Sequence, residues 1–160
     1  MALIHYITQI QIDFGAVQLL AQECDRLGIR RPLVVTDAGV RAAGVLERVT
    51  AQLGAGREFV VFDGTPSNPT ERAMRSAVAL YAEHRCDGIV AVGGGSPIDL
   101  AKGVAVCATH EGPLKSFAAI EGGVARITAA TAPVIAVPTT AGTGSEVGRG
   151  AVLILDEATA

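Results

Sequence analysis

The stretch Gly-Ile-Val-Ala-Val-Gly-Gly-Gly-Ser-Pro-Ile-Asp at residues 88–99 combines three signals that decide the fold. Its first five residues form a short apolar run, which is typical of a buried parallel strand. Ser96 and Asp99 follow at the spacing of a capping box, so a helix with Ser96 as N-cap is expected to run from there to about residue 109. The glycines between the two elements, including Gly94 and Gly95, let a ligand approach the backbone closely. Because a helix N-terminus favours anions, we interpret this stretch as a phosphate-binding turn rather than a plain strand-to-helix turn.

The rest of the chain repeats the alternation of short apolar runs and helical segments. Further strands are predicted at residues 32–36, 58–62, 133–137 and 151–155, and a short strand or hairpin at 4–14. Further helices are predicted at residues 16–27, 40–53 and 69–85. Such alternation predicts an α/β fold, a Rossmann-like parallel sheet with helices on both faces and right-handed crossovers. A length of 160 residues suits one domain, residues 1–160.

The start of the third helix carries a full set of helix signals. Asn68 is a good N-cap residue, Pro69 suits the first helical position, and Glu71 can complete a capping box. The sequence therefore predicts Asn68 as the cap of this helix.

A second loop rich in hydroxyls and glycines follows the strand at 133–137. Thr139, Thr140, Thr143 and Ser145 lie within seven residues that also include two glycines. Such a loop offers hydroxyl and backbone N–H donors to an anion or a ribose, although it is also typical of a flexible polar connection. Ligands of open α/β sheets bind outside the carboxyl ends of the strands, where both loops are expected.

Three charged residues have two interpretations each. Asp37 ends a strand, where a carboxylate can accept hydrogen bonds from an adenosine ribose, but it can equally cap the helix that follows. Asp99 is either a ligand contact or the acidic partner of Ser96 in the capping box, and Lys102 is either functional or a solvated helix residue. These alternatives stay open from the residues alone.

Composition argues against several functions. The net charge of -3 and the lack of a basic run give no reason to expect nucleic acid or an anionic membrane as partner. No apolar run reaches the roughly 18 residues of a membrane helix. Apolar residues make up 49% of the chain, which buried parallel strands would explain. A face that packs against a further domain or another copy would explain it equally, and a homo-oligomer is expected.

The cysteines and histidines lack the spacing of a metal or redox site. Cys24, Cys86 and Cys107 are far apart, so we expect small core residues in a reducing cytoplasm, and the N-terminus has no secretory signal. The three histidines are also widely separated, so no metal ligands are expected in this chain. Neither the Gly-x-Ser-x-Gly motif of hydrolases nor a Walker motif occurs.

Four segments together resemble the iron-containing alcohol dehydrogenase family. They are residues 35–37 (Val-Thr-Asp), 63–70 (Asp-Gly-x-Pro-x-Asn-Pro-Thr), 93–102 and 138–146 (Pro-Thr-Thr-Ala-Gly-Thr-Gly-Ser-Glu), in the family's order. The resemblance implies an N-terminal dinucleotide-binding domain. It implies that Asp37 contacts the adenosine ribose, that Asn68 lines the adenine side, and that Asp99 lies near the nicotinamide ribose. The pyrophosphate would be held by Gly94, Gly95 and Ser96, and the cradle would be completed by Thr139, Thr140 and Thr143.

The resemblance also implies the reaction. Members of the family transfer a hydride reversibly between an alcohol or aldehyde and NAD, with Fe2+ or Zn2+ bound by an aspartate and three histidines of a C-terminal helical domain. No position here matches those ligands, so no catalytic residue is assigned, and this chain alone is expected to bind NAD(H) without turnover. Related folds of glycerol dehydrogenase, dehydroquinate synthase or maleylacetate reductase type, and a non-catalytic nucleotide-binding module, are the alternatives.

Overall fold

The computed structural model describes residues 8–156, and these form a three-layer α/β arrangement. Four parallel strands lie in the order β2-β1-β3-β4, so β1 and β3 occupy the centre of the sheet. The strands are β1 (Pro32–Val35), β2 (Val60–Phe62), β3 (Gly88–Gly93) and β4 (Val134–Pro138). The predicted α/β class with a parallel, Rossmann-like sheet is confirmed.

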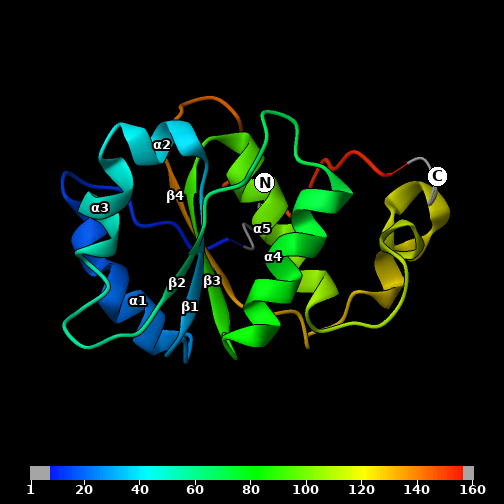
Figure 1. Cartoon of the computed structure of the whole chain (residues 1–160), viewed down its shortest axis with the longest axis horizontal. Helices are drawn as coiled ribbons and strands as arrows, with labels where there is room; N and C mark the ends of the chain where they lie inside the picture. The colour runs from blue at the N-terminus through cyan, green and yellow to red at the C-terminus, as the bar shows by residue number, and fades with distance from the viewer. Residues whose placement is uncertain (1–7, 157–160) are drawn as a thin grey trace, which may run out of the picture.

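Helices cover both faces of the sheet, as Figure 1 shows. Leu33 and Val35 of β1 pack in one apolar cluster with residues of α4 and α5, whereas Val34 packs in the other cluster with residues of α1 and α3. Strand side chains alternate between the two faces, so a fully buried central strand must be apolar throughout. The helices are α1 (Leu20–Arg26), preceded by η1 (Ala16–Leu19), α2 (Ala38–Ala42), α3 (Val45–Thr50), α4 (Glu71–Glu83) and α5 (Gly95–Cys107).

The single helix predicted at residues 40–53 is two short helices, α2 and α3. Gly44 separates them with a φ of 69°, a left-handed conformation that glycine adopts without the steric cost of a Cβ. The periodicity of the apolar residues continues across this break, which is why the sequence predicted one helix. Gly28 follows the C-cap of α1 with a positive φ, as predicted. Helix α3 instead ends at Thr50, before the predicted end at residue 53, so Gly54 does not terminate it.

Two predicted helix caps are wrong. Helix α4 is capped by Thr70, whose Oγ1 accepts a hydrogen bond from the Ala73 N–H at 3.2 Å, so Asn68 and Pro69 precede the helix. Helix α5 begins at Gly95 with Gly94 as N-cap, and Ser96 therefore lies inside the first turn. At each helix start the sequence contains two residues that can serve as N-cap: Asn68 and Thr70 for α4, and Gly94 and Ser96 for α5. Contacts with other parts of the chain determine which of the two caps the helix.

The apolar segment at residues 151–155 is not a strand. Its Ile154 forms one isolated parallel bridge with Thr70, in which the Ile154 N–H donates to the Pro69 carbonyl and its carbonyl accepts from the Glu71 N–H. The segment therefore lies against the start of α4 instead of extending the sheet. Residues 8–14 also form no strand, and residues 1–7 of that predicted element lie outside the described residues.

Between α5 and β4 the chain forms a small lobe, drawn in yellow in Figure 1. It contains three short 3-10 helices: η2 (Leu114–Phe117), η3 (Ala119–Glu121) and η4 (Gly123–Arg126). His110, just beyond α5, holds this lobe, because its Nε2 accepts a hydrogen bond from the Thr128 N–H at 2.9 Å and its ring packs edge-on against Phe117. Within residues 8–156 the structure has no helix that is long and apolar enough to span a membrane.

Removing the cap of α4 tests the corrected helix start. Thr70→Ala should lower the free energy of unfolding by about 1 kcal/mol, because the Ala73 N–H loses its acceptor. The exposed Asn68 provides a matched control, and Asn68→Ala should change the free energy by less than about 0.5 kcal/mol. Urea denaturation measures both values, and equal losses in the two variants would contradict the cap seen here.

Candidate functional site

The candidate site lies where the four parallel strands end. Asp37 follows β1, the loop 63–70 follows β2, Gly94 follows β3, and residues 139–149 follow β4. In Figure 1 helix α2 and the orange loop after β4 lie at the same, upper end of the sheet. The chain leaves β1 toward β2 and then crosses back to β3, so the strand order reverses between β1 and β3. Crevices at such reversals, outside the carboxyl ends of the strands, are the usual ligand sites of open α/β sheets.

The two loops rich in glycine and hydroxyls contact each other. The Thr139 N–H donates to the Gly93 carbonyl at 2.9 Å, which continues the pairing of β3 with β4 past the strand ends. A Cβ on Gly94 would lie 3.1 Å from Oγ1 of Thr140. A Cβ on Gly95 would lie 3.2 Å from Oγ of Ser145 and 3.5 Å from Cβ of Thr143. The structure thus brings Gly94 and Gly95 together with the hydroxyl loop.

Different neighbours require glycine at positions 93, 94 and 95. Gly93 has a φ of 155°, and a Cβ there would lie 2.6 Å from Cγ of Pro97, so the turn itself requires glycine. Gly94 and Gly95 instead leave room for the facing loop. The prediction that three glycines exceed the need of a simple turn agrees with this division.

Asp37 caps helix α2, as one of its two interpretations predicted. Its Oδ1 accepts a hydrogen bond from the Val40 N–H at 2.9 Å, and its backbone forms an antiparallel bridge with Gly64. The side chain is half-buried at the end of β1. Because a carboxylate has about four acceptor positions on two oxygens, capping does not exhaust its capacity.

Ser96 connects the loop after β2 to the start of α5. Its hydroxyl donates a hydrogen bond to the Ser67 carbonyl, so the neighbouring Asn68 is held near the first turn of α5 with its side chain exposed. Asn68 is therefore close to Ser96 because its backbone neighbour Ser67 accepts the Ser96 hydrogen bond. Neither Asn68 nor Ser96 is the helix cap that the sequence predicted.

Asp99 and Lys102 form a half-buried hydrogen-bond network. It replaces two of the interpretations made from the sequence, the capping role of Asp99 and the solvated position of Lys102. Lys102 Nζ lies 3.3 Å from Oδ1 of Asp99 and donates to the Gly150 carbonyl at 2.7 Å. Oδ2 of Asp99 accepts from the Val152 N–H at 3.0 Å. The side chains of Lys102 and Asp99 are only 17% and 13% exposed, so Lys102 is not a solvated residue and Asp99 is not a capping partner of Ser96. The network ties α5 to residues 150–152.

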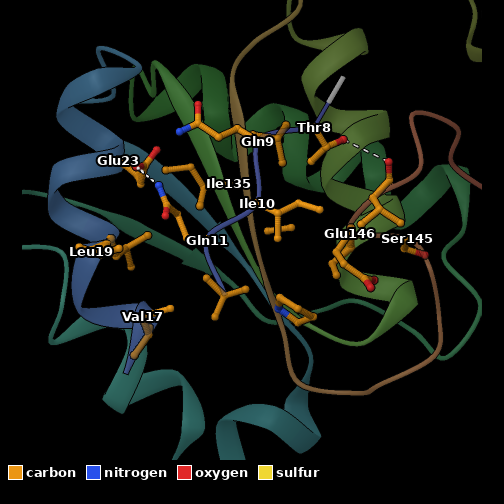
Figure 2. A pocket seen from close by; sticks show the side chains of 18 of the residues that line it. Thr8, Gln9, Ile10, Gln11, Val17, Leu19, Glu23, Ile135, Ser145 and Glu146 are labelled. Atoms are coloured by element: carbon orange, nitrogen blue, oxygen red, sulfur yellow. Dashed lines mark hydrogen bonds between the residues drawn. The ribbon is translucent and has the colours of Figure 1, made fainter. Parts of the chain in front are cut away.

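A cavity of about 660 Å³ runs along the edge strand β4 and is not part of the predicted site. Figure 2 shows residues 8–11 crossing it, with Gln11 hydrogen-bonded to Glu23 of α1 and Thr8 to the Val147 carbonyl. Ile98 and Lys102 of α5 also line it, but the nine residues predicted to contact a dinucleotide do not. Sequence reasoning missed this cavity because it depends on which strand lies at the edge of the sheet.

Titratable groups in the described part of the chain point to no metal site or activated thiol there. Residues 8–156 contain no group of three or more His, Cys, Asp or Glu side chains that could hold a metal ion. Burial raises the pKa of the Cys86 thiol to about 11 and also raises the pKa values of Cys24 and Cys107. A thiol nucleophile needs a lowered pKa. Cys24 is a buried core residue, as predicted, whereas Cys86 and Cys107 are only partly buried against the core.

Comparison with known proteins identifies the family. The model of iron-containing alcohol dehydrogenases matches residues 8–160. The 4-hydroxybutyrate dehydrogenase of Cupriavidus necator is 64% identical over 157 residues, which are 98% of this chain and 41% of that protein. A crystal structure of 1,3-propanediol oxidoreductase superposes with a TM-score of 0.82 at 39% identity, covering 91% of this chain and 37% of that one. For NADH-dependent butanol dehydrogenase A of Thermotoga maritima the TM-score is 0.81 at 25% identity, with coverages of 97% and 44%.

The chain spans about two fifths of the length of these relatives. The family match over residues 8–160 includes the whole parallel sheet and both contacting loops. The chain belongs to the iron-containing alcohol dehydrogenase family.

Proposed function

We propose that this chain is the NAD(H)-binding part of a metal-dependent alcohol dehydrogenase. The observation that carries the proposal is the contact between the two glycine- and hydroxyl-rich loops at the carboxyl ends of β3 and β4. One relative is named as NADH-dependent, which supports a nicotinamide dinucleotide as the ligand.

The residues present fit the pyrophosphate of a dinucleotide. Helix α5 is 13 residues long, and the unpaired N–H groups and dipole of its N-terminus favour an anion. No side chain projects from Gly94 or Gly95, so a phosphate can approach the backbone there. Threonine hydroxyls from the facing loop supply further neutral donors. The residues proposed to hold the pyrophosphate and complete its cradle are Gly94, Gly95, Ser96, Thr139, Thr140 and Thr143.

The remaining contacts are proposed for the two riboses and the adenine. Asp37 would accept hydrogen bonds from the adenosine ribose, and Asn68 would line the adenine side. A carboxylate at this position disfavours the 2′-phosphate of NADP, so NAD(H) should be preferred. Asp99 would face the nicotinamide ribose while Lys102 and the Val152 N–H hold its carboxylate in place. Positioned groups of this kind lower the entropic cost of orienting a cofactor.

The metal, Fe2+ or Zn2+, is proposed to be held by the remainder of the protein, because residues 8–156 offer no cluster of ligands for it. When bound, it would act as a Lewis acid on the alcohol or aldehyde oxygen. The names of two relatives specify 4-hydroxybutyrate and 1,3-propanediol, which both carry a hydroxyl on a terminal carbon. We therefore propose a primary alcohol as the substrate of the complete protein.

The glycine at position 95 provides a direct test of the cofactor site. Gly95→Val should weaken NADH binding at least about tenfold, because its side chain would fill the space between α5 and the loop at Thr143 and Ser145. Ala119→Val is the matched control, since Ala119 is exposed and lies in η3, outside the proposed site. NADH fluorescence titration measures both affinities, and circular dichroism checks the fold. Unchanged affinity in a folded Gly95→Val variant would mean that Gly95 serves only the packing of the two loops.

Separating binding from turnover tests the proposed division of the active site. The 160-residue chain should bind NADH but produce none from NAD with 4-hydroxybutyrate or 1,3-propanediol, whether or not Fe2+ or Zn2+ is added. The protein extended through its metal-binding part should turn over one of these alcohols and lose activity on chelation. Clear metal-dependent turnover by the 160-residue chain alone would contradict the proposal.

A further inference from the structure

An arginine lies beside the carboxylate proposed to face the adenosine ribose. Arg41 follows Asp37 by four residues, and the Arg41 N–H donates to the Asp37 carbonyl within the first turn of α2. Its guanidinium pairs with Asp63, with Nη1 2.5 Å from Oδ2. The antiparallel bridge between Asp37 and Gly64 places Asp63 next to this turn. Three charged side chains are therefore gathered where β1 and β2 end.

The charges of this group oppose a phosphate on the ribose. Two carboxylates and one guanidinium leave a net negative charge, whereas a 2′-phosphate carries up to two negative charges of its own. Dinucleotide-binding sheets that accept NADP commonly use an arginine near the end of the strand, because its planar fork binds phosphate oxygens in pairs. Arg41 stands at such a position, but Asp63 already occupies part of its fork.

We propose that the Arg41–Asp63 ion pair is a second determinant of NAD(H) over NADP(H) selectivity, acting beside Asp37. Asp63 engages Arg41 and adds a negative charge, so the one guanidinium in this group is withheld from a 2′-phosphate. The inference rests on the proposed NAD(H) site.

The Arg41–Asp63 ion pair lies on the surface of the protein, so it can be changed by substitution without affecting buried residues. The side chains of Arg41 and Asp63 are 55% and 43% exposed, so substituting Asp63 leaves no buried charge without a partner. Substitution of Asp63 should therefore free Arg41 without disturbing the core. The expected gain in phosphate binding is electrostatic and should shrink as ionic strength rises.

The experiment compares NADPH and NADH affinities by fluorescence titration in a set of variants. Asp37→Ala alone should improve NADPH binding only modestly, because Arg41 is still engaged by Asp63. Asp37→Ala with Asp63→Asn should bind NADPH about tenfold more tightly than Asp37→Ala, since one charge-assisted contact is gained. Adding Arg41→Ala to that pair should abolish the gain. Glu23→Gln is the matched control, because it also removes a carboxylate paired with an arginine, Arg26, but on α1.

The outcomes separate this inference from the function on which it rests. A gain in NADPH affinity that depends on Arg41, falls at high salt and is absent in Glu23→Gln supports it. If the unmodified chain binds NADH but Asp63→Asn leaves NADPH affinity unchanged in the Asp37→Ala background, the inference is wrong and the proposed function stands. A gain that persists after Arg41→Ala also overturns it. Failure of the unmodified chain to bind NADH would overturn both.

Discussion

The hydrogen bond from the Thr139 N–H to the Gly93 carbonyl continues the pairing of β3 and β4 beyond the end of the sheet. It sets the distance between the loop that begins α5 and the loop that follows β4. At that distance a Cβ on Gly94 would meet the Thr140 hydroxyl, and one on Gly95 would meet Ser145. The short distance between the two loops therefore requires glycine on one loop where hydroxyl side chains face it from the other. The proposed pyrophosphate site depends on this distance.

The sheet beneath these loops provides a rigid support. Strands β1 and β3 are buried along their whole length, and both faces are covered by helices. Close-packed interiors of this kind have low compressibility, so the ends of the strands keep fixed relative positions. The Asp99–Lys102 network adds a polar connection from α5 to residues 150–152, so the segment after the second loop is also fixed relative to the first. The proposed site needs such order, because a dinucleotide bound there would contact the ends of several strands at once.

The parallel sheet and most helices were predictable from the sequence, because buried strands leave short continuous apolar runs and amphipathic helices leave periodic apolar patterns. Local choices were less predictable. Thr70 caps α4 in place of Asn68, and Gly44 divides a helix whose apolar period is continuous. Residues 151–155 have the composition of a strand, but Ile154 pairs with the start of α4 rather than with the sheet. Such outcomes depend on tertiary contacts, which a pattern along the chain does not record.

The same limit applies to the candidate site. Two loops at strand ends could be predicted to lie together, because parallel strands end at one edge. The roles of Lys102 and the Arg41–Asp63 pair depend on contacts between segments 22 to 48 residues apart, and no spacing in the sequence indicates them. The cavity along β4 likewise follows from the strand order.

Mapping NADH on the isotope-labelled chain by NMR tests the central claim most directly, because it distinguishes the strand-end loops from the cavity along β4. We expect backbone amide shifts to change at Gly93–Ser96 and at residues 139–145, with a further change at Asp37. Residues 9–13 and α1, which border the cavity, should be unaffected. Shift changes confined to the cavity, with the two glycine-containing loops unperturbed, would contradict it.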